Sequence, residues 1–254
     1  MNVQYFKWYS QCLCRDMEYK TYGDNGRPFL VIPTQDGRFF DWENRHMIDL
    51  MSPWIERGDI RVICCDAIDA ETWSAKGADG AHRAWLQEQW FHYITDELIP
   101  SVRKEGWETF YTIGCSLGGT HAVNFALRRP DIFAGCIAMS GLYHADYFFD
   151  GYRDVNVYNN SPADYLPQMP WDHHYMNLYR NNRMIIVNGQ GRWEAECLDS
   201  TRKMQQIFHD KGIPAHYIYW GTDTDHDWPS WEVMLPMYLD EILYWEFLPN
   251  TCHW

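Results

Sequence analysis

The chain has 254 residues, with 35 acidic and 21 basic side chains and a formal net charge of −14. This charge argues against nucleic acid or an anionic membrane surface as a partner, because such contacts need clustered Lys and Arg. Hydrophobic residues make up 46% of the chain and charged residues 22%, which is typical of a globular protein and excludes a disordered one. Aromatic residues are unusually frequent, at 17%.

The compartment is predicted from the N-terminus and the cysteines. The first residues lack the basic and apolar regions of a secretory signal, and no apolar run is long enough to predict a transmembrane helix. The eight cysteines lie mostly inside apolar runs, without the spacing of a zinc site. We therefore expect a cytoplasmic protein with buried free thiols, no membrane partner and no metal.

The first predicted element is an antiparallel hairpin, because residues 3–9 and 12–22 alternate apolar and polar side chains. The continuous apolar run 29–32 predicts a strand buried on both faces of a sheet. Pro100 interrupts the predicted helix 82–105 and is expected to kink it. Further strands are predicted at 60–65, 109–114, 133–139, 183–188 and 215–220, and further helices at 42–57, 118–129, 195–211 and 230–247.

This alternation predicts an α/β fold, with a mostly parallel central sheet and helices on both faces. The length fits a single domain over residues 1–254. One segment, 141–181, breaks the rhythm and has no clear period. It is rich in aromatic residues, and so long a connection is typical of a cover over a functional site.

A nucleophile elbow is predicted at Ser116. Gly114 and Gly118 enclose this serine between a predicted strand and a predicted helix, as a Gly-x-Ser-x-Gly turn requires. The backbone N–H of Leu117 would then bind a developing oxyanion. The alternatives are a plain tight turn or a phosphate loop, and the lack of a lysine after the glycines argues against the latter. Cys115 is expected to point into the core.

The general base is expected late in the chain, in the order serine, acid, histidine. Two histidines follow the last predicted strand, His226 and His253, and His226 lies in the loop directly after it. Three aspartates surround His226, at positions 223, 225 and 227. They could bind calcium, but the loop lacks the glycine and the closing glutamate of an EF-hand. A solvated acidic loop is the better interpretation.

The acid is expected in the loop after strand 183–188. The position where an aspartate is expected holds Arg192, so Glu194 is predicted to be the acid and Glu196 is the alternative. A second alternative is that Glu194 only caps the following helix. A second oxyanion donor is expected from the loop after the strand 29–32, where Gln35 is chosen although the sequence cannot single out one backbone N–H.

Three segments of this chain resemble the α/β-hydrolase superfamily, and more narrowly its putative-esterase group, which includes esterase D-like enzymes and mycolyltransferases. They are Gly114–Gly119, Asp96–Pro100 and His226–Trp231. The resemblance covers roughly residues 25–248 and implies an α/β-hydrolase fold, ester hydrolysis or acyl transfer, and no cofactor. Arg192 departs from the family's usual acid pattern.

Together these features predict a serine esterase that hydrolyses a small soluble carboxylic ester through an acyl-enzyme on Ser116. Trp73, Trp193 and Tyr143 are predicted to line an aromatic pocket, although the rings of segment 141–181 could instead pack that segment onto the domain. The alternatives are an acyltransferase with the same triad and a non-catalytic binding protein on a hydrolase scaffold. The sequence gives no indication of the oligomeric state.

Overall fold

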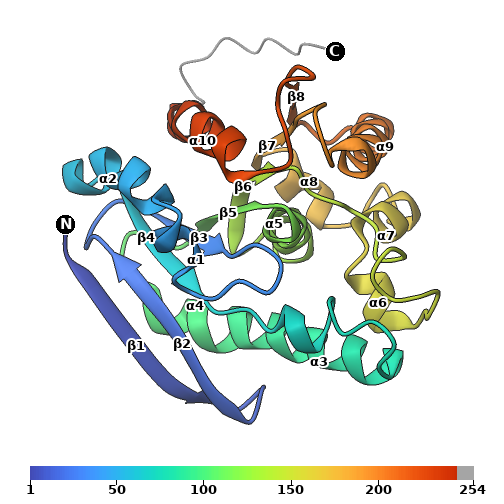
Figure 1. The fold of residues 1–254 in the computed structure, drawn as a ribbon, viewed down its shortest axis with the longest axis horizontal. Coiled ribbons are helices and arrows are strands. Elements are labelled where there is room, and N and C mark those ends of the chain that lie inside the picture. Colours follow the sequence, from blue (N-terminus) through green and yellow to red (C-terminus); the bar gives the residue numbers. More distant parts are fainter. Residues whose placement is uncertain (245–254) are drawn as a thin grey trace.

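The computed structural model describes residues 1–244 and is built around an eight-stranded sheet of order β1-β2-β4-β3-β5-β6-β7-β8 (Figure 1). The strands are β1 (Val3–Ser10), β2 (Arg15–Tyr22), β3 (Arg27–Ile32), β4 (Ile60–Cys65), β5 (Phe110–Cys115), β6 (Phe133–Met139), β7 (Arg183–Asn188) and β8 (His216–Tyr219). β1 and β2 form an antiparallel hairpin, β2 pairs antiparallel with β4, and the pairs from β4 to β8 are parallel. The predicted sheet and hairpin are confirmed.

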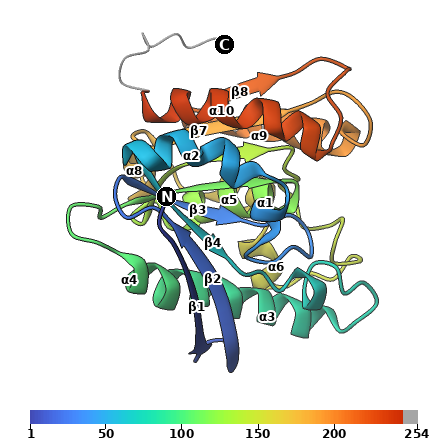
Figure 2. The same cartoon turned by 60° about the vertical axis from the view of Figure 1, so that its left-hand side comes forward.

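Helices cover both faces of the sheet, because alternate side chains of each buried strand point to opposite sides. In β3, Phe29 and Val31 belong to the hydrophobic cluster under α2 and α10, while Leu30 and Ile32 belong to the cluster under α3, α5 and α9. Figure 2 shows the hairpin at one end of the sheet and α10 across the other. The helices are α1 (Asp41–Asn44), α2 (Met47–Arg57), α3 (Gly80–His92), α4 (Ile99–Val102), α5 (Leu117–Arg128), α6 (Val155–Asn159), α7 (Pro162–Gln168), α8 (Tyr175–Tyr179), α9 (Ala195–Lys211) and α10 (Trp228–Leu243).

The predicted helix 82–105 changes type along its length. α3 runs into a π-helical turn, η2 (Tyr93–Leu98), and then into α4, where Pro100 lies in the first turn. Pro100 has no N–H to donate to a preceding carbonyl, which favours an altered turn before it. The Thr95 hydroxyl donates to the Phe91 carbonyl at 3.1 Å inside this turn. The expected kink is therefore a π-helical turn, and the helical run ends at Val102 instead of 105.

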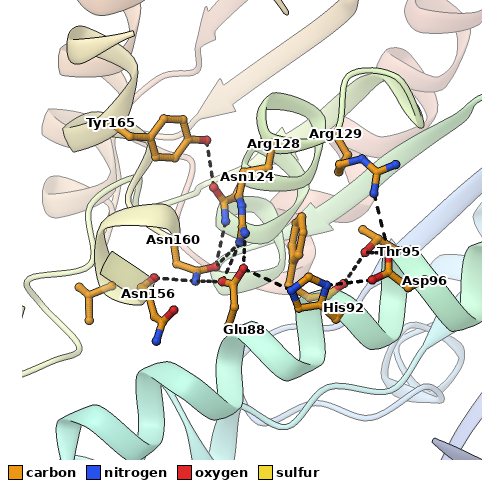
Figure 3. Close-up of polar contacts among 12 residues, drawn as sticks. Glu88, His92, Thr95, Asp96, Asn124, Arg128, Arg129, Asn156, Asn160 and Tyr165 are labelled. Atoms are coloured by element: carbon orange, nitrogen blue, oxygen red, sulfur yellow. Dashed lines mark hydrogen bonds and ion pairs between the residues drawn. The ribbon is translucent and has the colours of Figure 1, made fainter. Parts of the chain in front are cut away.

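The segment 141–181 contains three short helices that the sequence pattern did not predict, because none is long enough to show a hydrophobic period. α6 lies beside α3, and α7 contacts both α5 and α9 (Figure 1). Figure 3 shows the polar contacts that fasten the segment. Asn160 donates to Glu88 of α3 at 3.2 Å and accepts from Asn124 of α5 at 3.0 Å, while Tyr165 donates to Asn124 at 3.0 Å. Arg128 pairs with the same glutamate.

The ten aromatic rings of this segment differ in burial, and three of them, at Tyr152, Tyr165 and Tyr175, are half-buried. Four are buried, at Tyr143, Phe148, Phe149 and Tyr179, and pack the segment onto the body of the protein. Three are exposed, at Tyr147, Tyr158 and Trp171. Packing thus accounts for part of the aromatic excess seen in the composition.

Two further expectations concern cysteines and membrane spans. The seven cysteines of the described residues are free, and five of them are buried. Cys252 and His253 lie outside the described residues, as does the end of the predicted helix 230–247. Within residues 1–244, no helix combines the length and the apolar character needed to cross a membrane.

Candidate active site

Ser116 lies on a strained turn between β5 and α5, with φ 55° and ψ −127°. The two flanking glycines are required by close backbone contacts. A Cβ atom at Gly114 would lie 2.3 Å from the backbone of Gly118, and one at Gly118 would lie 2.4 Å from the Pro33 carbonyl oxygen. Side chains at these positions would force strand and helix apart, so the predicted strand–turn–helix geometry is present.

Cys115, the residue before the serine, points into the core as expected. It is buried in the cluster between the sheet, α2 and α10. Burial raises the pKa of its thiol well above the ordinary value, so the thiol stays protonated at neutral pH. A protonated thiol is a poor nucleophile, so the structure does not favour Cys115 as the nucleophile of this turn.

His226 approaches Ser116 from the loop between β8 and α10. Its Nε2 lies 2.8 Å from the Ser116 Oγ, which is hydrogen-bond distance. The Trp231 ring packs edge-on against the imidazole, with the ring centroids 5.2 Å apart. About a fifth of the His226 side chain, 18%, is exposed, so the serine and the imidazole meet at the edge of solvent.

Glu194 lies on the other side of the imidazole, and its side chain is fully buried. Its Oε2 is 3.4 Å from the Nδ1 of His226, while Glu196 is exposed. The Asn188 amide donates to Oε2 at 2.9 Å, and the Ser140 hydroxyl donates to Oε1 at 2.5 Å. Glu194 stands at the N-cap position of α9, but its side chain makes no capping bond. Its carboxylate oxygens are instead directed to His226, Asn188 and Ser140.

Ser140 and Asn188 were missed by sequence reasoning. Ser140 directly follows β6 and has φ 55°, and its Oγ also accepts from the Trp231 indole at 3.1 Å. Asn188 is the last residue of β7, and its side-chain Oδ1 accepts from the Thr201 hydroxyl at 3.1 Å. Their signal was present, because each is a polar residue at the carboxyl end of an apolar strand, where parallel strands bring loops together.

Arg192 ties the acid loop to the histidine loop. Its backbone N–H donates to Asp225 Oδ1 at 2.7 Å, and its Nε donates to Oδ2 at 2.8 Å. The backbone N–H and then the guanidinium of Arg192 lower the pKa of Asp225. The Arg192 carbonyl in turn accepts from the His226 N–H at 2.9 Å. The residue that departs from the family's acid pattern thus positions the loop that carries His226.

The side chains that could bind a metal ion together lie beside the His226 imidazole. Across the described residues, Glu194, Cys197 and His226 form the group whose potential ligand atoms lie within 4.8 Å of one another. Two of the three aspartates of the histidine loop have other partners, since Asp225 binds Arg192 and Asp227 caps α10 by accepting from the Trp228 N–H at 2.8 Å.

The two predicted oxyanion donors follow two neighbouring strands of the sheet, β5 and β3. Leu117 is the first residue of α5, so its N–H has no acceptor within the helix. Gln35 lies in the loop after β3, the strand next to β5, and its side chain donates to the Ser74 hydroxyl at 2.7 Å. The neighbouring Thr34 N–H is occupied, because it donates to Asp41 at 3.0 Å.

The three predicted pocket residues are not gathered into one wall. Trp73 is fully buried and packs edge-on against His121 and Phe148, at centroid distances of 5.3 Å and 4.9 Å. Tyr143 is fully buried in the main core, while 73% of Trp193 is exposed. Of these three rings, Trp193 alone presents its surface to solvent.

A surface cavity of about 360 Å³ lies at the opposite end of α5 from Ser116. Leu127, Tyr165 and Tyr175 are among its lining residues, and none of the predicted site residues is. It is therefore separate from the Ser116 site.

Comparisons with known proteins bear on the family and the fold. A family model described as "Putative esterase" matches residues 10–242. A search of curated proteins finds no match. Among solved structures, a ferulic acid esterase is 18% identical with a TM-score of 0.75, and the alignment covers 95% of this chain and 98% of that one. An S-formylglutathione hydrolase from Agrobacterium tumefaciens is 16% identical with a TM-score of 0.73, covering 95% and 94%.

A third solved structure is FphF, a fluorophosphonate-binding serine hydrolase from Staphylococcus aureus. It is 13% identical with a TM-score of 0.69, and the alignment covers 95% of this chain and 98% of that one. At such low identities the likeness shows the fold. The α/β-hydrolase fold predicted from the sequence is thereby confirmed.

Proposed function

Because the chain belongs to the Putative esterase family, we propose that it is a serine hydrolase that cleaves a small carboxylic ester through an acyl-enzyme on Ser116. The observation that carries this proposal is the 2.8 Å contact between Ser116 Oγ and His226 Nε2, with Glu194 on the opposite imidazole nitrogen. A serine needs such a base to become a nucleophile, and the base needs a group that orients it.

The proposed reaction has two steps. In the first, His226 Nε2 takes the Ser116 proton as Oγ attacks the ester carbonyl, and the imidazolium then protonates the leaving alcohol. In the second, a water molecule attacks the acyl-enzyme with the same histidine as its base, which releases the acid and restores the serine. Glu194 holds Nδ1–H and stabilises the imidazolium without itself taking a proton.

Oxyanion stabilisation is assigned to two backbone N–H groups. Leu117 begins α5, where the helix dipole favours a developing negative charge. Gln35 is the second assigned donor, because the N–H of Thr34 beside it is already committed to Asp41. The loss of one such donor costs about 10²–10³ in kcat in a well-studied serine hydrolase.

The substrate class follows the names of similar proteins and the chemistry of the site. A ferulic acid esterase and an S-formylglutathione hydrolase share this fold, and both names denote the cleavage of an acyl group from oxygen or sulfur. We extend this to a small acyl ester for this chain. The free cysteines support the further proposal that the protein works in a reducing compartment such as the cytoplasm.

A fluorophosphonate probe tests the proposal directly, because it reacts with activated serines. We expect wild-type protein to be labelled at Ser116 and the folded Ser116→Ala variant to remain unlabelled. Hydrolysis of short-chain nitrophenyl esters should be lost in parallel. Folded wild-type protein that neither reacts with the probe nor turns over these esters would overturn the proposal and favour a non-catalytic binding protein. Supplying alternative alcohols as acceptors then separates hydrolysis from acyl transfer.

A further inference from the structure

Cys197 is a buried thiol beside the imidazole that the proposed reaction does not use. It lies in the first turn of α9, three residues after Glu194, and its Sγ is 3.9 Å from the Nδ1 of His226. The same nitrogen lies 3.4 Å from Glu194 Oε2. One thiol, one imidazole nitrogen and one carboxylate oxygen therefore surround a single point, all within 4.8 Å of one another.

These spacings are close to those around a tetrahedral zinc ion. With ordinary zinc–ligand bond lengths, neighbouring nitrogen and oxygen ligands are about 3.4 Å apart, and neighbouring sulfur and nitrogen ligands about 3.6 Å apart. The nitrogen–oxygen distance here is 3.4 Å and the sulfur–nitrogen distance is 3.9 Å. The nitrogen–oxygen spacing thus already matches a zinc site and the sulfur–nitrogen spacing exceeds one by about 0.3 Å, whereas 3.4 Å is at the long end for a hydrogen bond.

The charge balance also suits a divalent ion. A carboxylate from Glu194 and a thiolate from Cys197 together neutralise a 2+ charge, which is what a buried site requires. Cys197 releases its thiol proton to solvent when it binds, and the neutral imidazole binds through Nδ1. Glu194 is already oriented by Asn188 and Ser140, so a fixed outer shell is in place.

We propose that Glu194, Cys197 and His226 form an inhibitory zinc site on the Nδ1 side of the imidazole. A metal on Nδ1 places the ring proton on Nε2, and Nε2–H then donates to Ser116 Oγ instead of accepting the serine proton. Bound zinc also takes Glu194 away from its role as the orienting acid. Zinc binding and catalysis are therefore mutually exclusive, and removing the metal restores activity. The inhibition rests on the proposed function, whereas the binding does not.

Binding is tested first, without reference to activity. Purified protein is titrated with Co²⁺, whose thiolate complexes absorb in the near ultraviolet, and with Zn²⁺ in competition. We expect one thiolate-bound ion per chain. The affinity should fall on the order of 100-fold in Cys197→Ala, because one of the three side chains that bind the ion directly is lost. Cys14→Ala, which removes an exposed thiol, is the matched control and should bind as wild type does.

Inhibition is tested second, with each variant compared with its own metal-free rate. Zinc should block fluorophosphonate labelling and ester turnover in wild type and in Cys14→Ala, and a chelator should restore both. Cys197→Ala should need on the order of 100-fold more zinc for the same inhibition. Equal zinc binding by wild type and Cys197→Ala, or no thiolate absorption in folded wild type, would overturn the site. If no variant is active, the absorption titration still decides the site, and the proposed function alone fails.

Discussion

Two pairs of a carboxylate and an imidazole lie along α5, and their surroundings differ. Glu194 and His226 meet above the start of the helix, where the second imidazole nitrogen contacts Ser116 at 2.8 Å. His121 lies within α5 and contacts Asp69 at 3.2 Å, and both of these side chains are only 2% exposed.

The second pair is enclosed by aromatic rings. His121 contacts Trp73 and Trp90, with ring centroids 5.3 Å and 5.0 Å away, and no serine hydroxyl bonds it among the contacts of the described residues. The Asp69 carbonyl accepts from the Ser74 N–H at 2.8 Å, and the hydroxyl of that serine accepts from Gln35 at 2.7 Å. The same chemical pair thus supports a loop in one place and contacts the Ser116 hydroxyl in the other. The two pairs differ in the partner of the second imidazole nitrogen.

Replacing the histidine that faces Ser116 should have the largest effect. We expect His226→Ala to lower kcat by about 10⁵-fold or more, because triad members act as a unit. Its melting temperature should stay within a few degrees of wild type, since the side chain is partly exposed. Ester kinetics and thermal unfolding measure the two quantities. A variant that keeps a tenth of wild-type kcat would show that the two pairs do not differ in the way described.

Glu194→Gln comes next, with an expected loss of about 10³–10⁴-fold in kcat, since an amide cannot stabilise the imidazolium and favours the wrong tautomer. Glu196→Gln is the matched control, because Glu196 is exposed two residues further along. Its kcat should stay within twofold of wild type. A larger loss in the control than in Glu194→Gln would assign the acid to Glu196 instead.

His121→Ala should affect stability and not chemistry. It leaves the Asp69 carboxylate buried without its partner, so we expect the free energy of unfolding to fall by about 3 kcal/mol. The kcat of the folded protein should fall less than tenfold, through the loop that bears Gln35. Urea titration and kinetics below the unfolding transition measure these effects. A loss of kcat as large as that of His226→Ala, at wild-type stability, would make the enclosed pair part of the chemistry.

The smallest effect is expected at the ion pair of Arg192 and Asp225, which lies beside His226. Arg192→Ala should change stability by about 1 kcal/mol or less, because exposed ion pairs contribute little. The backbone N–H of residue 192 still donates to Asp225, so the histidine loop keeps one of its bonds. Asp225→Ala removes the acceptor of both bonds and should lower the melting temperature and kcat further. Equal effects of the two variants would show that the backbone bond adds nothing.

Sequence periodicity predicted the sheet well, because the buried strands are largely apolar runs and most of them are followed by a helix of several turns. It could not predict α6, α7 and α8, which have seven residues or fewer. Asn160 after α6 and Tyr165 of α7 bond side chains of α3 or α5, and Tyr179 of α8 donates to the Leu127 carbonyl of α5. Sequence periodicity also placed a proline-kinked helix where a π-helical turn occurs. Contacts with distant segments decide such elements more than local pattern does.

The site was predictable where chain order constrains it. The strand–turn–helix context selected Ser116, and the loop after the last strand selected His226. The sequence favoured Glu194 over Glu196 only because Glu194 comes first after the strand. In the structure Glu194 is distinguished by its burial, by its contact with His226 and by the bonds from Ser140 and Asn188. The His121 and Asp69 pair, 52 residues apart, left no local signal at all.

The loop that carries Glu194 and the loop that carries His226 are bonded to each other, which affects how they unfold locally. Gly191 N–H donates to the Thr224 carbonyl at 2.8 Å, Arg192 binds Asp225, and His226 N–H donates to the Arg192 carbonyl at 2.9 Å. Neither loop can leave its place without breaking bonds to the other. Local unfolding should therefore release acid and base together, as one cooperative unit whose backbone amides exchange hydrogen at a common rate.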